Sequence, residues 1–458
     1  MDVSEREARS AQAQGLVAEL SDQGVMAVAA TFVDNSGITR VKTVPLDRLP
    51  LLAAWGVGIS TCFDRFRCDD WIAGPSDGSA SVGDLRIIPD LRRLVTLAAQ
   101  PGWAWAPADR YQQSGEPHAQ CNRLLLQRVT DELAGQGFTV KATFEIEWVV
   151  SEGPGNDFTA GVQGPGYGMT RLVGLSDYSR DVLTALAGEG VSVDQFHPEY
   201  APGQLELSVA ADSPTGAADT SVLVRSTIRA VGVAHGLRTS FSPKVAVPGV
   251  GNGGHVHLSV WRDDENLMAG GAGRFGLSGT GEAFSAGILS RLPALLAVGA
   301  PSVVSYLRLV PSHWAGAYAC WGLENREAAM RMVTGSTGST SWAANMEVKC
   351  FDLLANPYLL MAALLVAGSA GISEGSALPD PIDVDPAALD ESVLASRGIT
   401  RLPTNLGESL AAFAAEPALM NAFGSDLVES IVAVRQSEME LFADASDEDL
   451  AAATRWLH

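Results

Sequence analysis

Four short stretches of the chain alternate between apolar and polar residues. They are residues 143–150, 204–210, 254–261 and 345–351. Alternation of this kind predicts β-strands with one buried face, because successive side chains in a strand point to opposite sides. In each stretch the apolar positions share one side, so we predict strands whose entire back lies on a hydrophobic core.

Helical periodicity occupies much of the chain between and after these strands. The predicted helices are residues 121–136, 178–187, 219–235, 284–297, 357–371 and 424–444. Strands interspersed with helices in this way predict an α+β fold.

The N-terminal part predicts a smaller, β-rich domain. Strand-like residues 27–33 and 40–44 flank the turn-forming residues 34–37, which predicts a hairpin. Pro and Gly residues then interrupt the chain shortly before the first long helical pattern. We therefore predict an N-terminal domain at residues 15–112 and a larger domain at residues 113–458.

The polar face of each alternating strand carries acids or histidines. These faces contain Glu145 and Glu147, then Glu206, then His255, His257 and Ser259, and finally Glu347 and Lys349. Together with Glu199, the five carboxylates would repel one another strongly on one sheet unless cations lay among them. Oxygen ligands with an imidazole suit Mg²⁺ or Mn²⁺. We therefore predict a concave, charged sheet that binds two divalent ions.

Each motif alone also has an ordinary structural explanation. A single Glu-x-Glu on a strand is usually a solvated edge, and residues 251–254 alone favour a turn over a phosphate-binding loop. Arg308, Arg326 and Arg331 follow in a largely apolar region, where arginine is costly unless it meets an anion. Ligand phosphate or carboxylate groups are the obvious anions, and buried structural ion pairs are the alternative. The functional interpretation rests on the conjunction of these motifs.

The composition narrows the class of protein. With 458 residues, of which 47% are hydrophobic and 18% charged, the chain is large enough for two well-buried domains. Its formal charge of −22 and its four lysines argue against a nucleic-acid-binding surface and favour small cations.

The cysteines and the apolar segments predict a cytoplasmic protein. No two of the five cysteines form a CxxC motif, and an odd number of cysteines cannot all pair in disulfide bonds. The polar residues 1–14 lack the apolar core of a secretory signal. The most apolar stretches, residues 295–310 and 358–372, are short or interrupted, whereas a membrane span needs about 20 apolar residues. We therefore expect no membrane partner.

Several long motifs, kept in order and spacing, resemble those of the type I glutamine synthetase family over nearly the whole chain. They are FEIE at 144–147, HPEYAPGQLE at 197–206, GNGGHVH at 251–257, NREAAMR at 325–331, EVK at 347–349 and ANPY at 355–358. The resemblance implies a small N-terminal β-grasp domain and a large catalytic domain with a curved antiparallel sheet backed by helices. It also implies an ATP-dependent ligase that activates the γ-carboxylate of L-glutamate as γ-glutamyl phosphate and joins it to an amine.

The resemblance further implies a role for each residue of the charged face. The ligands of one metal ion would be Glu147, Glu199 and Glu206, and those of the other would be Glu145, His255 and Glu347. The residues along ATP would be His257, Ser259, Arg326 and Arg331, of which Arg326 and Arg331 would be catalytic. The residues that bind glutamate would be Arg308, Gly251 and Lys349. Lys349 replaces the arginine usual in the family, which exchanges a bidentate fork for a point charge.

Two departures from the family pattern concern the amine. Family members that use ammonia carry a flap glutamate where this chain has Trp314, and an ammonium-binding aspartate where it has residues 58–62. An aromatic side chain offers apolar contact and cation–π attraction to an alkylammonium group. Some other group must then accept the proton of the amine, and the candidates near these departures in sequence are Asp64 and Glu324.

Three phrases, QFHPEY at 195–200, WAGAYACWG at 314–322 and NMEVK at 345–349, look most like the γ-glutamylpolyamine synthetase branch of actinobacterial glutamine synthetase-like proteins. This branch implies acceptors such as putrescine, cadaverine, spermidine and spermine, in polyamine catabolism. A ligase for ethanolamine or another monoamine is the alternative, followed by an ammonia-using glutamine synthetase or a non-catalytic scaffold. The family also implies a homo-oligomer with active sites shared between subunits, expected to be a dodecamer of two stacked hexamers.

Overall fold

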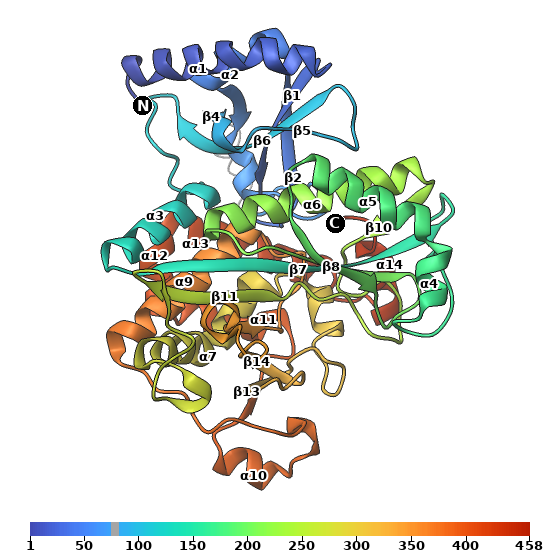
Figure 1. Cartoon of the computed structure of the whole chain (residues 1–458), viewed down its shortest axis with the longest axis vertical. Helices are drawn as coiled ribbons and strands as arrows, with labels where there is room; N and C mark the ends of the chain where they lie inside the picture. The colour runs from blue at the N-terminus through green and yellow to red at the C-terminus, as the bar shows by residue number, and fades with distance from the viewer. Residues whose placement is uncertain (75–81) are drawn as a thin grey trace.

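The computed structural model describes residues 1–74 and 82–458, which form two β-sheets covered by helices (Figure 1). The six-stranded sheet contains β1 (Ala27–Val33), β2 (Thr39–Pro45), β3 (Val57–Ser60), β4 (Asp84–Pro89), β5 (Val95–Thr96) and β6 (Trp103–Gln112). The ten-stranded sheet contains β7 (Thr139–Glu152), β8 (Val193–Pro198), β9 (Gln204–Val209), β10 (Leu237–Ser240), β11 (Val256–Arg262), β12 (Glu265–Asn266), β13 (Tyr318–Leu323), β14 (Ala328–Val333), β15 (Asn345–Val348) and β16 (Thr400–Arg401).

The helices lie at the N-terminus and around the larger sheet. The two that accompany the smaller sheet are α1 (Val3–Asp22) and α2 (Leu49–Trp55). The others are α3 (Asn122–Gly135), α4 (Met169–Gly174), α5 (Ser176–Gly188), α6 (Pro214–Ala234), α7 (Gly279–Gly299), α8 (Thr340–Ala343), α9 (Pro357–Glu374), α10 (Glu391–Ser396), α11 (Leu406–Ala414), α12 (Pro417–Phe423), α13 (Ser425–Leu441) and α14 (Asp447–Thr454). This mixture confirms the α+β class.

The smaller sheet has the order β2-β1-β6-β4-β3, and its central strands β1 and β6 run parallel. The predicted hairpin is confirmed, because β1 and β2 pair antiparallel around a tight turn. Helix α1 was not expected, and the predicted domain start at residue 15 lies inside it. Strand β6 ends at Gln112, and the domain boundary at residue 112 stays a prediction.

The tip of this hairpin is inserted into the larger part of the protein. The Asn356 side-chain amide donates to the backbone oxygens of Val33 and Asp34, at 3.1 and 3.0 Å. At Gly37, where φ is +79°, a Cβ would lie 1.8 Å from the backbone oxygen of Leu354. Only glycine tolerates this combination of backbone conformation and close approach.

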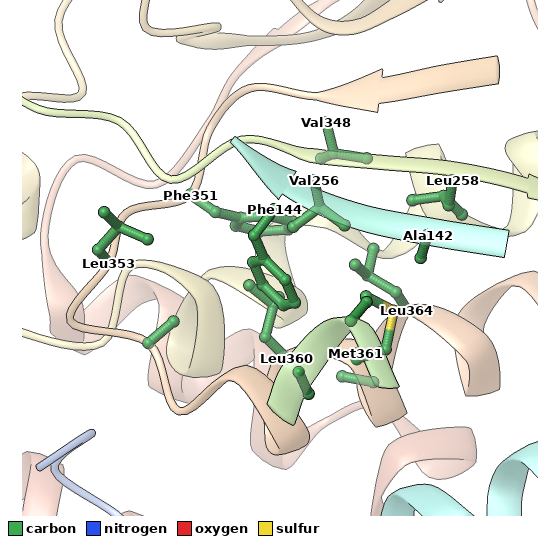
Figure 2. Close-up of a cluster of buried hydrophobic side chains, with 14 of the residues drawn as sticks. Ala142, Phe144, Val256, Leu258, Val348, Phe351, Leu353, Leu360, Met361 and Leu364 are labelled. Carbon is green, nitrogen blue, oxygen red and sulfur yellow. The ribbon is translucent and has the colours of Figure 1, made fainter. Parts of the chain in front are cut away.

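The larger sheet has the order β16-β13-β14-β15-β11-β7-β9-β8 and is antiparallel except for the parallel pair β13 and β14. The predicted apolar backs are confirmed on its central strands. Figure 2 shows Phe144, Val256 and Val348 together above Leu360 and Leu364 of α9, and all five are buried. Removing such surface from water stabilises the layer by about 25 cal/mol per Å².

Two helices, α7 and α9, are long and apolar enough to cross a membrane by length and composition alone. The apolar windows of these helices are 78% and 67% buried, and the two helices pack against each other. Both helices therefore form part of the hydrophobic core, as we predicted from the short or interrupted apolar stretches of the sequence. All five cysteines are free thiols, in agreement with the absence of a disulfide framework.

Glycine permits the close contact of α7 and α9. A Cβ at Gly287 would lie 2.3 Å from the Ala367 backbone oxygen and 2.7 Å from the Gly371 Cα. We expect Gly287→Ala to lower the free energy of unfolding by about 1–3 kcal/mol, because overpacking outweighs the better helix propensity of alanine.

Gly279→Ala is the matched control, because it lies in the first turn of the same helix and its Cβ would meet nothing within 4 Å. Urea unfolding of both variants measures the difference. Equal stabilities would contradict the close packing.

One buried ionic cluster joins the two sheets through the helices between them. Arg123 of α3 donates to Asp90 and Asp109 beside the smaller sheet and to Asp219 of α6, each at 2.9 Å. The Tyr358 hydroxyl donates to the same Asp219 at 2.8 Å. A single guanidinium thus serves three carboxylates, which makes it the central group of the junction.

Candidate active site

The strand register brings the predicted polar faces onto one side of the larger sheet. Glu147 of β7 lies opposite Glu206 of β9. On the other side of β7, His257 of β11 lies opposite Glu347 of β15, which in turn lies opposite Arg331 of β14. Residues from five segments of sequence therefore meet because their strands are neighbours.

These side chains line a cavity of about 970 Å³. Every residue assigned to the site from the sequence contributes to its wall: Glu145, Glu147, Glu199, Glu206, Gly251, His255, His257, Ser259, Arg308, Trp314, Arg326, Arg331, Glu347 and Lys349. The structure therefore places all of the predicted site residues together, while their individual roles stay predictions.

The register also orders the residues along the cavity. Ser259 lies opposite Lys141 at one end, and His257 lies opposite Thr143 nearer the middle. Toward the other end of β7 comes Glu147, which accepts a hydrogen bond from the backbone N–H of Gly253 at 2.9 Å. The cavity thus has a hydroxyl-bearing end and an acidic end.

Three groups of side chains could each hold a metal ion, because their ligand atoms lie within 4.8 Å of one another. They are Glu145, His257 and Glu347, then Glu145, Glu147 and His255, and then His197, Glu199 and Glu206. All six predicted ligands occur in these groups. The predicted division into two sets of three differs from this grouping, because His257 and His197 also lie within reach.

The carboxylates at the acidic end of the cavity are only partly paired with positive charge. Burial and the charges of Glu145, Glu147 and Glu199 raise the pKa of Glu206 to about 8, although a contact with His197 opposes the shift. Burial likewise raises the pKa of Glu147. The buried Nδ1 of His197 has no hydrogen-bond partner. Carboxylates that resist ionisation beside an unpaired imidazole nitrogen fit a divalent cation as the missing partner.

The middle of the cavity is neutralised by protein cations. The Lys349 ammonium lies 2.9 Å from one oxygen of Glu347, and Arg331 lies 3.0 Å from the other. Burial disfavours the charged form of Glu347, but Lys349 and His257 outweigh it and hold its pKa below its usual range. From the sequence, Lys349 was assigned to glutamate and Arg331 to the phosphate groups. In the structure both also contact Glu347, a predicted metal ligand.

Arg308 is buried at the junction of these groups. It donates to the backbone oxygen of Phe351 at 3.2 Å, and its Nη2 lies 3.1 Å from Nε2 of His255. At Gly253 a Cβ would lie 2.8 Å from both Arg308 Nη2 and Glu147 Oε1. A side chain at residue 253 would therefore displace these charged groups, whereas at Gly251 a Cβ would lie 1.9 Å from the backbone oxygen of Pro243.

Sequence reasoning missed several side chains of the cavity. His197 lies 3.2 Å from Glu206, and the side-chain amide of Gln204 donates to Glu147 at 2.9 Å. The Tyr167 hydroxyl donates to Glu199 at 2.7 Å. The alternation of His197 with Glu199 was a signal for the first. Tyr167 lies outside any periodic pattern, so nothing in the sequence marked it.

The structure places neither candidate base in the cavity. Asp64 is buried in the N-terminal part, where its carboxylate pairs with Arg110 and lies 2.8 Å from His118. Glu324 is exposed and does not belong to the cavity wall. Within one subunit, nearness in sequence to Trp314 did not bring Glu324 into the cavity, and a role of Asp64 in a neighbouring subunit's site stays a prediction.

Trp314 lies at the acidic end, on a loop with an unusual backbone. Its φ is +55°, and its N–H donates to Glu327 at 2.9 Å. Its ring lies 5.1 Å from the ring of Tyr200, centre to centre. An aromatic side chain, held by its neighbours, therefore lies at the acidic end of the cavity.

Comparison with known proteins identifies the family. The model of the glutamine synthetase catalytic domain matches residues 119–450. The chain belongs to the glutamine synthetase family. The resemblance drawn from the sequence motifs is thereby confirmed.

The glutamine synthetase family relatives cover almost the full chain. The chain is 52% identical to the γ-glutamylpolyamine synthetase GlnA3 of Streptomyces coelicolor, over 97% of this chain and 96% of that protein. It is 30% identical to the type-1 glutamine synthetase 1 of Dictyostelium discoideum, over 92% and 87% of the two chains.

Two solved structures have the same fold. A crystal structure of a glutamine synthase homologue has a TM-score of 0.85 at 32% identity and covers 95% of this chain and 99% of its own. The GmaS/ADP complex has a TM-score of 0.82 at 27% identity and covers 94% and 97%.

Family membership settles the class of reaction. The protein is a ligase of the glutamine synthetase family, whose members use ATP and divalent metal ions. The charged cavity fits these requirements, since it combines carboxylates for metal ions with arginines for phosphate groups.

Proposed function

We propose that this ligase joins the γ-carboxylate of L-glutamate to a polyamine such as putrescine, cadaverine, spermidine or spermine. The observation that carries the proposal is the 52% identity, over nearly the whole chain, to a γ-glutamylpolyamine synthetase. Trp314 supports it independently, because an aromatic flap suits an alkylammonium group better than ammonium.

In the proposed reaction, the six predicted ligands would hold two Mg²⁺ or Mn²⁺ ions, which would supply charge neutralisation at the phosphates. Arg326 and Arg331 stabilise the phosphoryl group as it passes to the glutamate side chain, which gives γ-glutamyl phosphate. Arg308, Gly251 and Lys349 hold glutamate in the cavity. The amine then displaces phosphate, and exclusion of water from the cavity protects the acyl phosphate from hydrolysis.

The proposed assembly is a homo-oligomeric ring, expected to be a dodecamer in the cytoplasm. The family builds each site from two neighbouring subunits, so a subunit alone would leave the site open to solvent. Light scattering of the purified protein measures the mass of the assembly. An active monomer would contradict the ring, and a single hexamer would correct its size.

The acceptor is tested with an amine panel. ATP-dependent phosphate release and γ-glutamyl product are measured with ammonium, ethanolamine, putrescine and spermidine. We expect the di- and polyamines to exceed ammonium at least about tenfold in kcat/KM, because cation–π and apolar contacts favour alkylammonium groups.

The variant Trp314→Glu restores the flap acid and should shift this ratio toward ammonium. Equal or better use of ammonium by the wild type would contradict the amine-ligase proposal. A clear preference for ethanolamine would keep the chemistry and move the protein to a monoamine branch.

A further inference from the structure

Three aromatic side chains, Tyr167, Tyr200 and Trp314, surround the acidic end of the cavity, and we call them the aromatic rim. All three line the cavity, and they are 62%, 50% and 43% exposed. Their ring faces are therefore accessible to a ligand, in contrast to the buried aromatic residues of the core.

The rim closes over the charged face of the sheet from opposite sides. Trp314 precedes β13, and Tyr200 lies in the turn between β8 and β9. In the described sheet β13 is separated from β9 by β14, β15, β11 and β7. Because the two rings nevertheless lie 5.1 Å apart, both loops must lean across the face that carries the acids.

Residues of the aromatic rim donate hydrogen bonds to two carboxylates. One oxygen of Glu199 accepts hydrogen bonds from the Tyr167 hydroxyl at 2.7 Å and from the Tyr200 N–H at 2.8 Å. On the opposite side, Glu327 accepts from the N–H of Trp314. Carboxylates therefore lie on both sides of the accessible rings, which makes the rim attractive to a cation.

The rim is also held firmly in place. Arg171 is buried and donates to the backbone oxygens of Gly164, Glu199 and Ala201, at 2.6–2.9 Å. These contacts bind together the two segments that carry Tyr167 and Tyr200. Tyr167 and Trp314 both have positive φ, at +56° and +55°. Such strained conformations persist only where the surroundings enforce them, and they concentrate at ligand sites.

We infer that the aromatic rim is the subsite for the second ammonium group of a diamine or polyamine acceptor. The inference rests on the proposed function and extends it, since it assigns the residues that distinguish a diamine from a monoamine. While one amine of the acceptor reacts inside the cavity, the other stays charged and needs a cation site of its own. Electron-rich ring faces flanked by carboxylates supply a suitable environment for it.

The test compares two acceptors of equal length that differ only in the second charge, putrescine and n-butylamine. In the wild type we expect kcat/KM to favour putrescine by about fivefold or more, the range of a cation–π contact at an exposed site. In Trp314→Leu and in Tyr200→Leu this ratio should fall several-fold toward unity, while Trp314→Phe should keep most of it because a ring face remains.

Trp342→Leu is the matched control, because Trp342 is an exposed tryptophan of α8 that lines the same cavity but does not belong to the aromatic rim. It should alter the two amines equally and leave their ratio unchanged. Use of both amines with a ratio that neither rim variant changes would overturn the subsite alone. Use of neither amine, with ammonium as the best acceptor, would overturn the proposed function and the subsite with it.

Discussion

The variant Glu147→Gln is expected to lose turnover at least about a thousandfold while remaining folded. Glu147 occurs in one of the candidate metal groups and lies opposite Glu206 at the acidic end. Removing its charge should weaken the metal that the phosphoryl transfer requires. Its pKa is already raised by burial, so a neutral amide of the same shape costs little stability.

Two measurements separate this loss from unfolding. Calorimetric titration with Mn²⁺ should lose binding at one site, and thermal unfolding of the metal-free protein should change little. Glu391→Gln, on the exposed first turn of α10, makes the same chemical change away from the cavity and should behave like the wild type. Turnover close to wild type in Glu147→Gln at limiting Mg²⁺ would show that the ligand assignment is wrong.

The variant Arg123→Met is expected to lower the free energy of unfolding by about 3–5 kcal/mol. Its guanidinium is shared by Asp90, Asp109 and Asp219 in the buried cluster. Asp90 and Asp219 also contact Arg92 and Arg93, so Asp109 depends most on Arg123. Removing one partner of a buried ion pair leaves uncompensated charge, which is far more costly than the pair itself is favourable. Burial already raises the pKa of Asp109 even with Arg123 present.

Arg128→Met provides the comparison on the same helix. Arg128 and its partner Glu132 are about half exposed, so this pair should contribute at most about 1 kcal/mol. Denaturant unfolding of both variants gives the two losses. If Arg123→Met lost no more stability than Arg128→Met, the cluster would not be what joins the sheets.

In the larger sheet, the sequence predicted those strands whose two faces differ. Strands β7, β9 and β11 have apolar backs and polar fronts, and their alternation survives in the structure. Strand β8 was missed because its residues are mostly half-buried or exposed on both sides. Strand β14 was missed for the opposite reason, since it is almost wholly apolar and Arg331 is its only charged residue. Periodicity identifies a strand only when its two faces meet different surroundings.

The sequence predicted which residues line the candidate site, but not which of them contact one another. Spacing within a strand is local, so Glu145 and Glu147 could be placed on one face from the sequence alone. The pairing of Arg331 with Glu347 depends on which strands are neighbours, and this is set by the whole fold. Asp64 illustrates the limit, because its partners Arg110 and His118 come together only through tertiary packing.

The insertion of the hairpin tip into the larger part of the protein limits which chimaeras with a relative should fold correctly. Leu354 and Asn356, which receive the tip, follow a few residues after the strand that carries Glu347. A chimaera that takes its first hundred or so residues from a relative would therefore disturb the segment behind the charged cavity unless the donor also has glycine at position 37. The two parts of the chain are therefore constrained to change together in evolution. Replacing either part alone should displace the strand that carries Glu347.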